Sequence, residues 1–370
     1  MRIVEIQAVP VSLPRSKPLV AAGTVTPLAS SEFGIVRVLT DEGLVGLGEI
    51  SMNGGFDGAR MCPVVREVLG PALEGHDPRE IRAASQRMDT LVDGLEPAKA
   101  GVEMALWDIA GKALGEPLHR LLGGRVREAL PVRWGIGFGD PGAGADEALG
   151  KIAEGFSAIK LKIGRPGTGE DLTMVRVVRE AVGDGAEIMV DANSAYRTVG
   201  EALRELRPLQ DHHLQLVEQP LPRHRLDDLA RVREQLDTPL LLDESMRPWK
   251  DAFAIGAAAA ADVLSVYVCE AGGIQAALDA LAVGHAAGMQ GLLGSQCEMG
   301  IGTAAMAHVG VVAPSIAYQS DATGHLRYRE DVIVEQLDYR DGALYPPTGP
   351  GLGVTLDEDV LTRYRLDTDR

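Results

Sequence analysis

The sequence of 370 residues has little of what marks a membrane or secreted protein. It has no apolar run near the roughly 20 residues of a membrane span. Its first residues, MRIVEIQAVPVSLPRSKP, alternate like a strand, whereas a signal peptide has a continuous apolar core. Only three cysteines occur, Cys62, Cys269 and Cys297, an odd number without metal-site spacing. We therefore expect isolated thiols in a reducing cytoplasm.

Positive charge is also scarce. The 36 lysines and arginines are outnumbered by 53 aspartates and glutamates, which leaves a net charge of −17. This balance argues against nucleic acid and anionic membranes as partners. No Walker motif or dinucleotide-binding glycine motif occurs, so we expect no nucleotide cofactor. The hydrophobic content of 45% is enough for a sizeable core.

The pattern of the chain changes near residue 130. Residues 1–50 read as strands around a long loop of small residues, PRSKPLVAAGTVTPLASSE, and residues 59–122 have a helical pattern. Strand-like runs then alternate with amphipathic helical stretches, which predicts a parallel sheet, and eight such units predict a closed β/α barrel. The eight runs are LPVRWGIGF, AIKLKIG, AEIMVDAN, LQLVEQP, PLLLDES, DVLSVYV, GLLGSQC and SIAYQSD.

The run AIKLKIG at 158–164 contains two lysines with one residue between them. Because strand side chains alternate, Lys160 and Lys162 share one face. A strand with a water-facing side would also alternate in this way. In a barrel, however, the outer face packs on helices and must be apolar, so both lysines would face the interior. Two lysines there need negative partners.

The next three strand-like runs each end in an acid. Asp191, Glu218 and Asp243 are separated by 27 and 25 residues, about one β/α unit each, so we expect them at one height in the barrel mouth. Each could instead cap the helix that follows. Three converging carboxylates would repel one another, and a divalent cation such as Mg²⁺ would remove that repulsion. We therefore predict that these acids hold a metal.

A metal that binds a substrate carboxylate would stabilise the enediolate formed when the neighbouring carbon loses its proton. A lysine beside that metal and beside another lysine has a lowered pKa and can act as the base. Lys162 lies nearer the end of its strand, so we assign it as the base. Lys160 would support it and contact the substrate carboxylate.

These residues resemble the mandelate racemase and muconate lactonizing branch of the enolase superfamily, and most of all its muconate lactonizing subgroup. The resemblance implies an α/β protein with a (β/α)7β TIM-like barrel over residues 129–340. An α+β capping domain over 1–128 would be completed by a C-terminal return over 341–370. The stretches that carry it are KLK, DAN, EQP and DES, with GVEMALWDIAGKALGEPLHRLLGG at 101–124 and GPGLGVTLDEDVL near the C-terminus.

The same resemblance implies loops at about 18–30 and 50–58 that close over a small carboxylate substrate. It implies one Mg²⁺ per subunit on the three acids, with Mn²⁺ as a substitute. Glu244 would lie behind the metal ligands, and Asn193 near them. We also expect a homo-oligomer, either a dimer or an octamer.

The sequence departs from the subgroup at the sixth strand. The subgroup has a lysine there, facing the lysine pair across the substrate. Here Tyr267 occupies that place, and residues 251–370 contain no lysine. With a reference pKa near 10, tyrosine is a poor base at neutral pH. Tyr267 is therefore either a proton donor or a hydroxyl that binds the substrate.

Further candidates follow the last two strand-like runs. Alternation in LLGSQCEMGIG places Ser295 and Cys297 inward, with Glu298 beside them. Asp321 resembles a position that receives a polar substrate group in this subgroup, although it could equally cap the following helix. We expect these four side chains to contact the substrate or to support those that do.

A clear base on one side favours a one-base reaction, the syn elimination of water from a small hydroxy acid or amino acid. The alternatives are a racemase or epimerase, or a cycloisomerase, with Tyr267 or another group as the second acid and base. A barrel that binds metal without turnover is a third possibility, against which the intact lysine pair and acids weigh.

Overall fold

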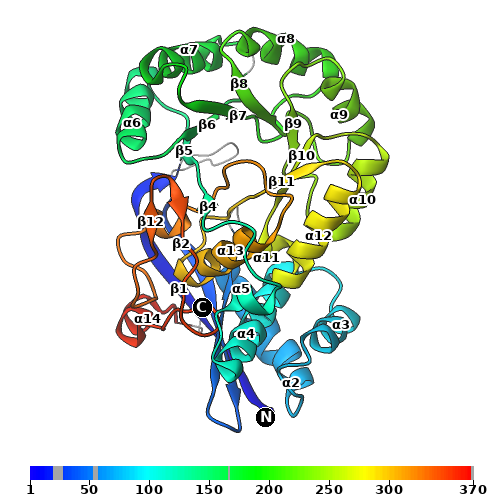
Figure 1. Cartoon of the computed structure of the whole chain (residues 1–370), viewed down its shortest axis with the longest axis vertical. Helices are drawn as coiled ribbons and strands as arrows, with labels where there is room; N and C mark the ends of the chain where they lie inside the picture. The colour runs from blue at the N-terminus through cyan, green and yellow to red at the C-terminus, as the bar shows by residue number, and fades with distance from the viewer. Residues whose placement is uncertain (20–27, 53–56, 166, 368–370) are drawn as a thin grey trace.

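The computed structural model describes residues 1–19, 28–52, 57–165 and 167–367. A ring of strands surrounded by helices forms the upper part of the molecule in Figure 1, and an antiparallel sheet with its own helices forms the lower part. The central parts of the two predicted loops, residues 20–27 and 53–56, lie outside the described residues.

The N-terminal sheet has three antiparallel strands in the order β1 (Ile3–Leu19), β2 (Leu28–Thr40) and β3 (Val45–Ile50). The first two strands run farther than the sequence predicted. Both strands extend into the stretch expected to be a loop, with Pro14 opposite Ser30 and, after an irregularity in the register, Leu19 opposite Leu28. Proline and small residues suggested a loop, but the backbone groups here pair across the two strands.

Most of residues 59–122 are helical, as their pattern predicts. The long helix α4 has Pro97 in its first turn and ends at Gly115, whose φ of 70° suits glycine. It lies so close to β3 that a Cβ at Gly48 would stand 1.8 Å from the carbonyl oxygen of Gly101. The elements are η1 (Gly58–Met61), α1 (Cys62–Val64), η2 (Val65–Leu69), α2 (Gly70–Leu73), α3 (Ile81–Leu91), α4 (Glu96–Leu114) and α5 (Leu118–Leu121).

Seven parallel strands form the barrel wall in sequence order, from β5 to β11. On β6, Ile159 and Leu161 are fully buried in the core shared with the helices, so Lys160 and Lys162 face the interior. The strands are β5 (Trp134–Ile136), β6 (Ala158–Lys162), β7 (Glu187–Asp191), β8 (Leu214–Glu218), β9 (Leu240–Leu242), β10 (Val263–Val266) and β11 (Gln290–Leu293).

The eighth run, SIAYQSD, closes the barrel without forming a regular strand. Ile316 makes a single bridge to Gly291 of β11, and Ser320 makes one to Val132 just before β5. The eighth run therefore takes the predicted place in the ring but does not form the regular strand that was predicted. Backbone hydrogen bonds join the segment to Gly291 and Leu293 of β11 and to Pro131 and Arg133 on the β5 side, so it closes the ring through separate contacts without a continuous ladder.

Helices cover the outside of this ring, as the alternating pattern predicts (Figure 1). The helices over 170–182 and 199–210 are two of the stretches that separate the strand-like runs. The elements are α6 (Pro141–Ala153), α7 (Glu170–Val182), α8 (Val199–Gln210), α9 (Leu226–Arg233), α10 (Trp249–Ala257), α11 (Val268–Ala271), α12 (Ile274–Ala286), α13 (Gly300–Val312) and η3 (Gly324–Arg327).

The C-terminal segment returns to the N-terminal part. Val11 of β1 bridges Arg365, which follows α14 (Glu358–Tyr364). A small sheet of β12 (Tyr339–Arg340), β13 (Ala343–Leu344) and β4 (Leu130–Pro131) pairs this segment with the start of the barrel. The domain boundaries at 128 and 340 stay a prediction.

Two buried carboxylates fix the N-terminal part to the barrel. Glu49 of β3 accepts hydrogen bonds of 2.8 Å from the backbone of Met299 and Gly302 at the start of α13. Glu103 of α4 accepts from the backbone of Ile274 and Gln275 at the start of α12. Each carboxylate thus satisfies amide groups that a helix start leaves unpaired.

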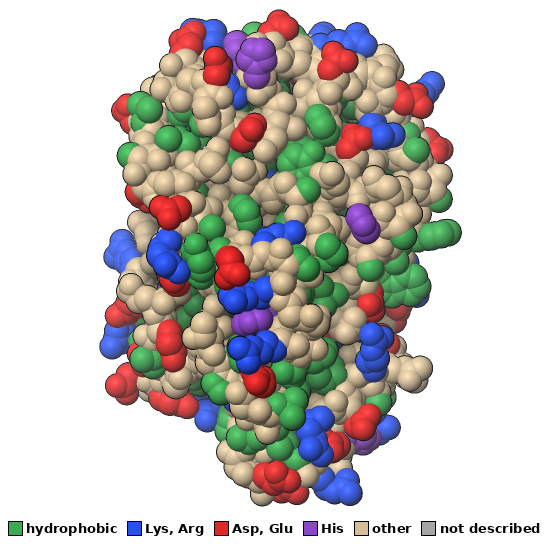
Figure 2. All heavy atoms as spheres, viewed as in Figure 1, with side chains coloured by type: hydrophobic (Ala, Val, Ile, Leu, Met, Phe, Trp, Pro, Cys, Tyr) green, Lys and Arg blue, Asp and Glu red, His purple; other side chains and the backbone are tan. Residues whose placement is uncertain are grey.

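The surface agrees with the mixed charge of the sequence. On the face in Figure 2, acidic and basic side chains are interspersed. Among the helices in the described ranges, none combines the length and apolar character needed to cross a membrane.

Candidate active site

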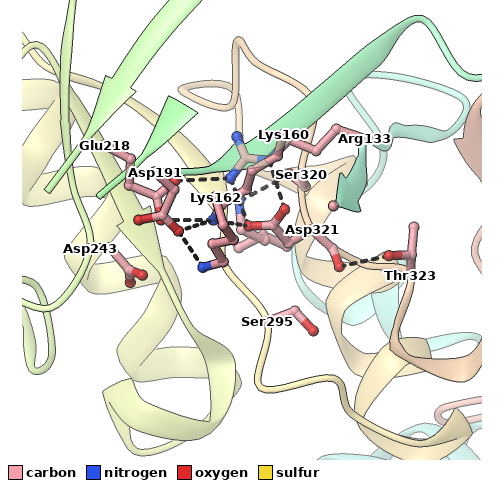
Figure 3. Close-up of polar contacts among 12 residues, drawn as sticks. Arg133, Lys160, Lys162, Asp191, Glu218, Asp243, Ser295, Ser320, Asp321 and Thr323 are labelled. Atoms are coloured by element: carbon pink, nitrogen blue, oxygen red, sulfur yellow. Dashed lines mark hydrogen bonds and ion pairs between the residues drawn. The ribbon is translucent and has the colours of Figure 1, made fainter. Parts of the chain in front are cut away.

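Side chains at the ends of neighbouring barrel strands meet at one mouth of the barrel (Figure 3). Lys162 at the end of β6 lies opposite Asp191 of β7, which lies opposite Glu218 of β8. Asp243 does not join this row, because Glu218 pairs with Leu241 and Asp243 comes two residues later. Asp191 and Glu218 lie in register, whereas Asp243 follows the end of β9, where the chain turns, and the shared metal site of the three acids stays a prediction.

Lys160 is buried among carboxylates. Its Nζ lies 2.7 Å from Glu218 Oε1, 3.1 Å from Asp191 Oδ2 and 3.2 Å from Asp321 Oδ2. Burial alone would lower the pKa of Lys160, but the nearby carboxylates outweigh it and raise the pKa well above its ordinary value. Lys160 therefore stays charged, which suits it to hold negative charge.

Lys162 is more open and is held by a chain of polar contacts. Its Nζ lies 2.5 Å from Asp191 Oδ2 and donates to Asn193 Oδ1 at 2.7 Å. Asn193 Nδ2 in turn donates to Glu244 Oε1 at 3.1 Å. The side chain of Lys162 is 22% exposed, against 7% for Lys160. Asn193 and Glu244 thus direct the lysine that is the more accessible to a ligand.

Arg133 completes this cluster and was missed in the sequence analysis. It is fully buried just before β5, and it donates through Nε and Nη2 to both oxygens of Asp321, at 2.7 and 2.6 Å. Burial would raise the pKa of Asp321, but Arg133 and Lys160 hold it below its usual range. Arg133 is a charged residue within the apolar run LPVRWGIGF. The reasoning that placed Lys160 and Lys162 inside the barrel could therefore have placed Arg133 there too.

Asp321 does not cap the helix that follows it, and its contact with a polar substrate group stays a prediction. Its carboxylate is bound to Arg133 and Lys160, and the following helix η3 has no side-chain cap bond at its start. Any substrate group that reached Asp321 would share it with these two cations.

Tyr267 follows the last residue of β10 and is buried. Its hydroxyl donates to Asp243 Oδ2 at 2.9 Å. Burial, followed by the charge of Asp243, raises the pKa of Tyr267 well above its ordinary value. Gly294 makes room for the ring, because a Cβ there would stand 2.2 Å from Tyr267 Cε2. Tyr267 thus stays protonated and orients a carboxylate of the site.

The residues after β11 form a second polar group beside the mouth. Ser295 Oγ donates to Glu298 Oε2, and the backbone of Cys297 donates to Ser295 Oγ at 2.9 Å. Cys269 Sγ lies 3.4 Å from Glu298 Oε1. The carbonyl oxygen of Cys297 accepts from the hydroxyl of Tyr328 at 2.6 Å. Ser295 and Glu298 hold the conformation of this segment.

Gln219 is a second residue that the sequence analysis passed over. Its Oε1 accepts from the backbone of Asp243 at 2.9 Å and of Ser245 at 3.2 Å. Its Nε2 donates to Ser245 Oγ and to the carbonyl oxygen of Leu221. The side chain thus ties the end of β8 to the end of β9, which explains a buried glutamine directly after Glu218.

The carboxylates carry more negative charge than the site neutralises. Burial and repulsion from Asp191 raise the pKa of Glu218 well above its ordinary value. Burial and repulsion from Glu244 raise the pKa of Asp243 to about 7. The pKa of Glu244 is also about 7, through burial and Asp191, and its Oε2 has no hydrogen-bond partner among the described residues.

The carboxylates of Asp191, Glu218 and Asp243 are chemically suited to bind a divalent metal. Three buried carboxylates that repel one another are the hard oxygen ligands that Mg²⁺ prefers. In the described part of the chain, no three metal-ligating side chains stand close enough together to form a metal cluster. Lys160 Nζ and Lys162 Nζ instead lie against the carboxylates that a metal would share.

Two family descriptions match this chain. Residues 3–123 match the N-terminal domain of mandelate racemase and muconate lactonizing enzyme, and residues 144–360 match the enolase C-terminal domain-like family. Among curated relatives, muconate cycloisomerase 1 of Pseudomonas putida is 34% identical over 89% of each chain. An N-succinyl-L-Arg/Lys racemase of Bacillus cereus is 31% identical over 100% of this chain and 99% of its own.

Solved structures agree with these matches. The muconate lactonizing enzyme of Pseudomonas fluorescens, complexed with muconolactone, superposes with a TM-score of 0.94 at 34% identity, over 98% of this chain and 99% of its own. These relatives support the cycloisomerase alternative better than the dehydratase that the sequence analysis placed first. The chain is an enzyme of the enolase superfamily and belongs to its mandelate racemase and muconate lactonizing enzyme family.

Proposed function

We propose that this enzyme moves a proton at the carbon next to a substrate carboxylate, with Lys162 as both acid and base. The position of Lys162 Nζ carries the proposal. It lies at the open end of the barrel, in register with Asp191, and Asn193 fixes its direction. Lys160 and Arg133 stay charged behind it and stabilise the negative charge that develops on the substrate as the proton leaves.

Asp191, Glu218 and Asp243 would hold a divalent cation, with Mg²⁺ as the natural ion and Mn²⁺ as a substitute. The raised pKa values of Glu218 and Asp243 mark negative charge that the protein alone leaves uncompensated. When bound, the ion would supply positive charge beside the substrate carboxylate. Enzymes of this family generally use a divalent metal.

The reaction uses one base. Tyr267, in the place where the subgroup has a lysine that faces the lysine pair, keeps its proton and donates a hydrogen bond to Asp243. It is therefore unsuited to remove a proton from the opposite face of the substrate. This supports chemistry on a single face and disfavours racemisation, although one relative is named a racemase.

Several reactions transfer a proton on one face of the substrate. We place cycloisomerisation first among them, because the relatives at 34% identity are named muconate cycloisomerase and muconate lactonizing enzyme. In such a reaction, a C–O bond forms or breaks at the carbon next to the one that gains or loses the proton. Syn elimination of water breaks the same kind of bond with the same base. The dehydratase is the second candidate because Tyr267 stands where the subgroup has a lysine.

Proton NMR in D₂O with Mg²⁺ tests the proposal. The panel contains muconate and muconolactone, β-hydroxy acids, hydroxyamino acids and N-succinylamino acids, and it reports exchange, cyclisation and elimination together. We expect exchange from one enantiomer in wild type, none in Lys162→Ala, and weakened exchange in Lys160→Met. Lys250→Ala, which removes an exposed lysine on α10, is the matched control. Exchange at the wild-type rate in Lys162→Ala would overturn the assignment of the base.

A further inference from the structure

Cys297 is the most accessible of the three cysteines of this chain. It is half-buried in the segment that follows β11, whereas Cys62 and Cys269 are fully buried. Its backbone has a φ of 57°, in the left-handed region that residues with a side chain rarely adopt. Ser295 Oγ accepts from its backbone N–H, and the Tyr328 hydroxyl donates to its carbonyl oxygen. These contacts hold Cys297 in an uncommon backbone conformation beside the barrel mouth.

Two guanidinium groups from distant parts of the sequence lie beside this thiol. Arg15 belongs to β1, and Arg327 ends η3. Burial alone would lower the pKa of Arg15, but Cys297 and then Tyr328 outweigh burial and raise this pKa. Burial lowers the pKa of Arg327, an effect that Cys297 opposes and Arg15 reinforces. The side chain of Cys297 therefore lies close enough to interact with both cations.

Arg15 is positioned by neutral partners and keeps one donor without an acceptor. It is only 4% exposed, and its Nη1 donates to Ser31 Oγ at 2.7 Å and to the Tyr328 hydroxyl at 3.2 Å. Because the same hydroxyl donates to the Cys297 carbonyl oxygen at 2.6 Å, the guanidinium is held against the segment that carries the thiol. The buried Nε of Arg15 has no hydrogen-bond partner in the described parts of the chain.

Arg327 also has neutral partners. Its Nη2 donates to the carbonyl oxygen of Gly135 at 3.2 Å, and its guanidinium lies 3.5 Å from the centroid of the Trp134 ring. Among the described residues, no carboxylate forms an ion pair with Arg15 or Arg327. Buried donors and cations without such partners are costly, so a negative charge on the neighbouring sulfur would supply the contact that they lack.

We propose that Cys297 is a site of oxidation by peroxides, and that Arg15 and Arg327 bind the anionic oxygen that its sulfur gains. The thiol first releases its proton, and the sulfur attacks one peroxide oxygen. An S–O bond forms while the O–O bond breaks, so sulfur is oxidised by two electrons and the peroxide is reduced. The second oxygen leaves as hydroxide and takes up the thiol proton to become water. The sulfenic acid then loses its proton to solvent and pairs as sulfenate with the two cations.

The electropositive and partly open surroundings of Cys297 are typical of reactive cysteines. The guanidinium groups would also stabilise the negative charge that develops on the leaving oxygen as the O–O bond breaks. The inference goes beyond the proposed function, because no step uses Lys162, a metal or a substrate. Its failure would therefore leave the proposed proton transfer untouched.

Mass spectrometry of the full-length protein in hydrogen peroxide tests this proposal. Dimedone traps the sulfenic acid, and peptide mapping locates the label. We expect Cys297 to be labelled at least about tenfold faster than free cysteine at the same pH, the range of a hydrogen bond to a charged group. Cys62 and Cys269 should stay unlabelled because they are buried. Labelling of Cys297 no faster than that of free cysteine would overturn the proposal.

The two arginines should accelerate this oxidation. We expect Arg15→Gln and Arg327→Gln each to slow the labelling of Cys297 about tenfold to a hundredfold. Lys17→Gln, which removes a lysine of β1 that is 78% exposed, should be labelled at the wild-type rate. Circular dichroism verifies the fold of each variant. Wild-type rates in the folded arginine variants, or equal slowing in Lys17→Gln, would overturn the proposal. If Arg15→Gln did not fold, Arg327→Gln and the comparison with free cysteine would still decide it.

Discussion

The hydroxyl of Tyr267 donates a hydrogen bond of 2.9 Å to Asp243 Oδ2. The contact joins the ends of two adjacent barrel strands, β9 and β10. A protonated tyrosine that is bound to a carboxylate orients that carboxylate and removes no proton. This relationship supports the proposed one-base reaction over epimerisation.

Tyr267→Phe keeps the ring and deletes this hydrogen bond. We expect kcat to fall about tenfold to a hundredfold, because a hydrogen bond to a charged group contributes about 1.5–3 kcal/mol. Exchange in D₂O should survive, and from the same single enantiomer as in wild type. If wild type exchanged both enantiomers and the variant lost only one of them, Tyr267 would be a second acid and base.

The three strand-end acids should act as one metal site. We expect Asp191→Asn, Glu218→Gln and Asp243→Asn each to weaken Mg²⁺ binding by at least about tenfold and to abolish exchange, because each removes a charged ligand. Calorimetry with Mg²⁺ measures the affinity, and circular dichroism verifies the fold. Asp211→Asn, on the loop after α8, is the control and should bind Mg²⁺ as wild type does. Unchanged affinity in all three variants would place the metal elsewhere.

Arg133 and Asp321 form a buried pair whose separation should be costly. We expect Arg133→Met to lower the free energy of unfolding by about 3–5 kcal/mol, because it leaves Asp321 without its bidentate partner. The double variant Arg133→Met with Asp321→Asn should lose less than the two single losses added together. Urea unfolding measures all three, and strict additivity would show that the pair is not coupled.

His308 should make the protein sensitive to acid. His308 accepts from the backbone of His119 at 3.2 Å, and its Nε2 lies 3.2 Å from the carbonyl oxygen of Leu352, so the neutral ring satisfies both contacts. Burial lowers the pKa of His308 to about 3 from 6.5. Between pH 6.5 and pH 3, His308 is therefore protonated in the unfolded chain and neutral in the folded protein. The free energy of unfolding should fall by up to about 1.4 kcal/mol per pH unit as the pH drops towards 3.

His308→Gln retains one acceptor and one donor but does not titrate. We expect its free energy of unfolding, measured in urea between pH 6 and pH 4, to depend less on pH than that of wild type. Equal slopes for the two proteins would show that His308 does not cause the acid sensitivity.

Much of the site was predictable from the sequence because its signals are local or periodic. Alternation within AIKLKIG places Lys160 and Lys162 on one face, and spacings of 27 and 25 residues place three acids at successive strand ends. Strand geometry fixes the first relationship and the length of a β/α unit the second. Both hold whatever the side chains elsewhere do, and with the quoted motifs they were enough to indicate the family.

Other features depend on contacts that only the folded chain creates. Arg133 and Asp321 are 188 residues apart and meet because the irregular eighth segment closes the barrel beside β5. The turn after β9 moves Asp243 out of the row of Asp191 and Glu218 and places it against Tyr267. The sequence determined which residues face the barrel interior, since periodicity is a property of each strand alone. Only the tertiary structure decided which of them bind one another, since those contacts depend on register, turns and closure between distant segments.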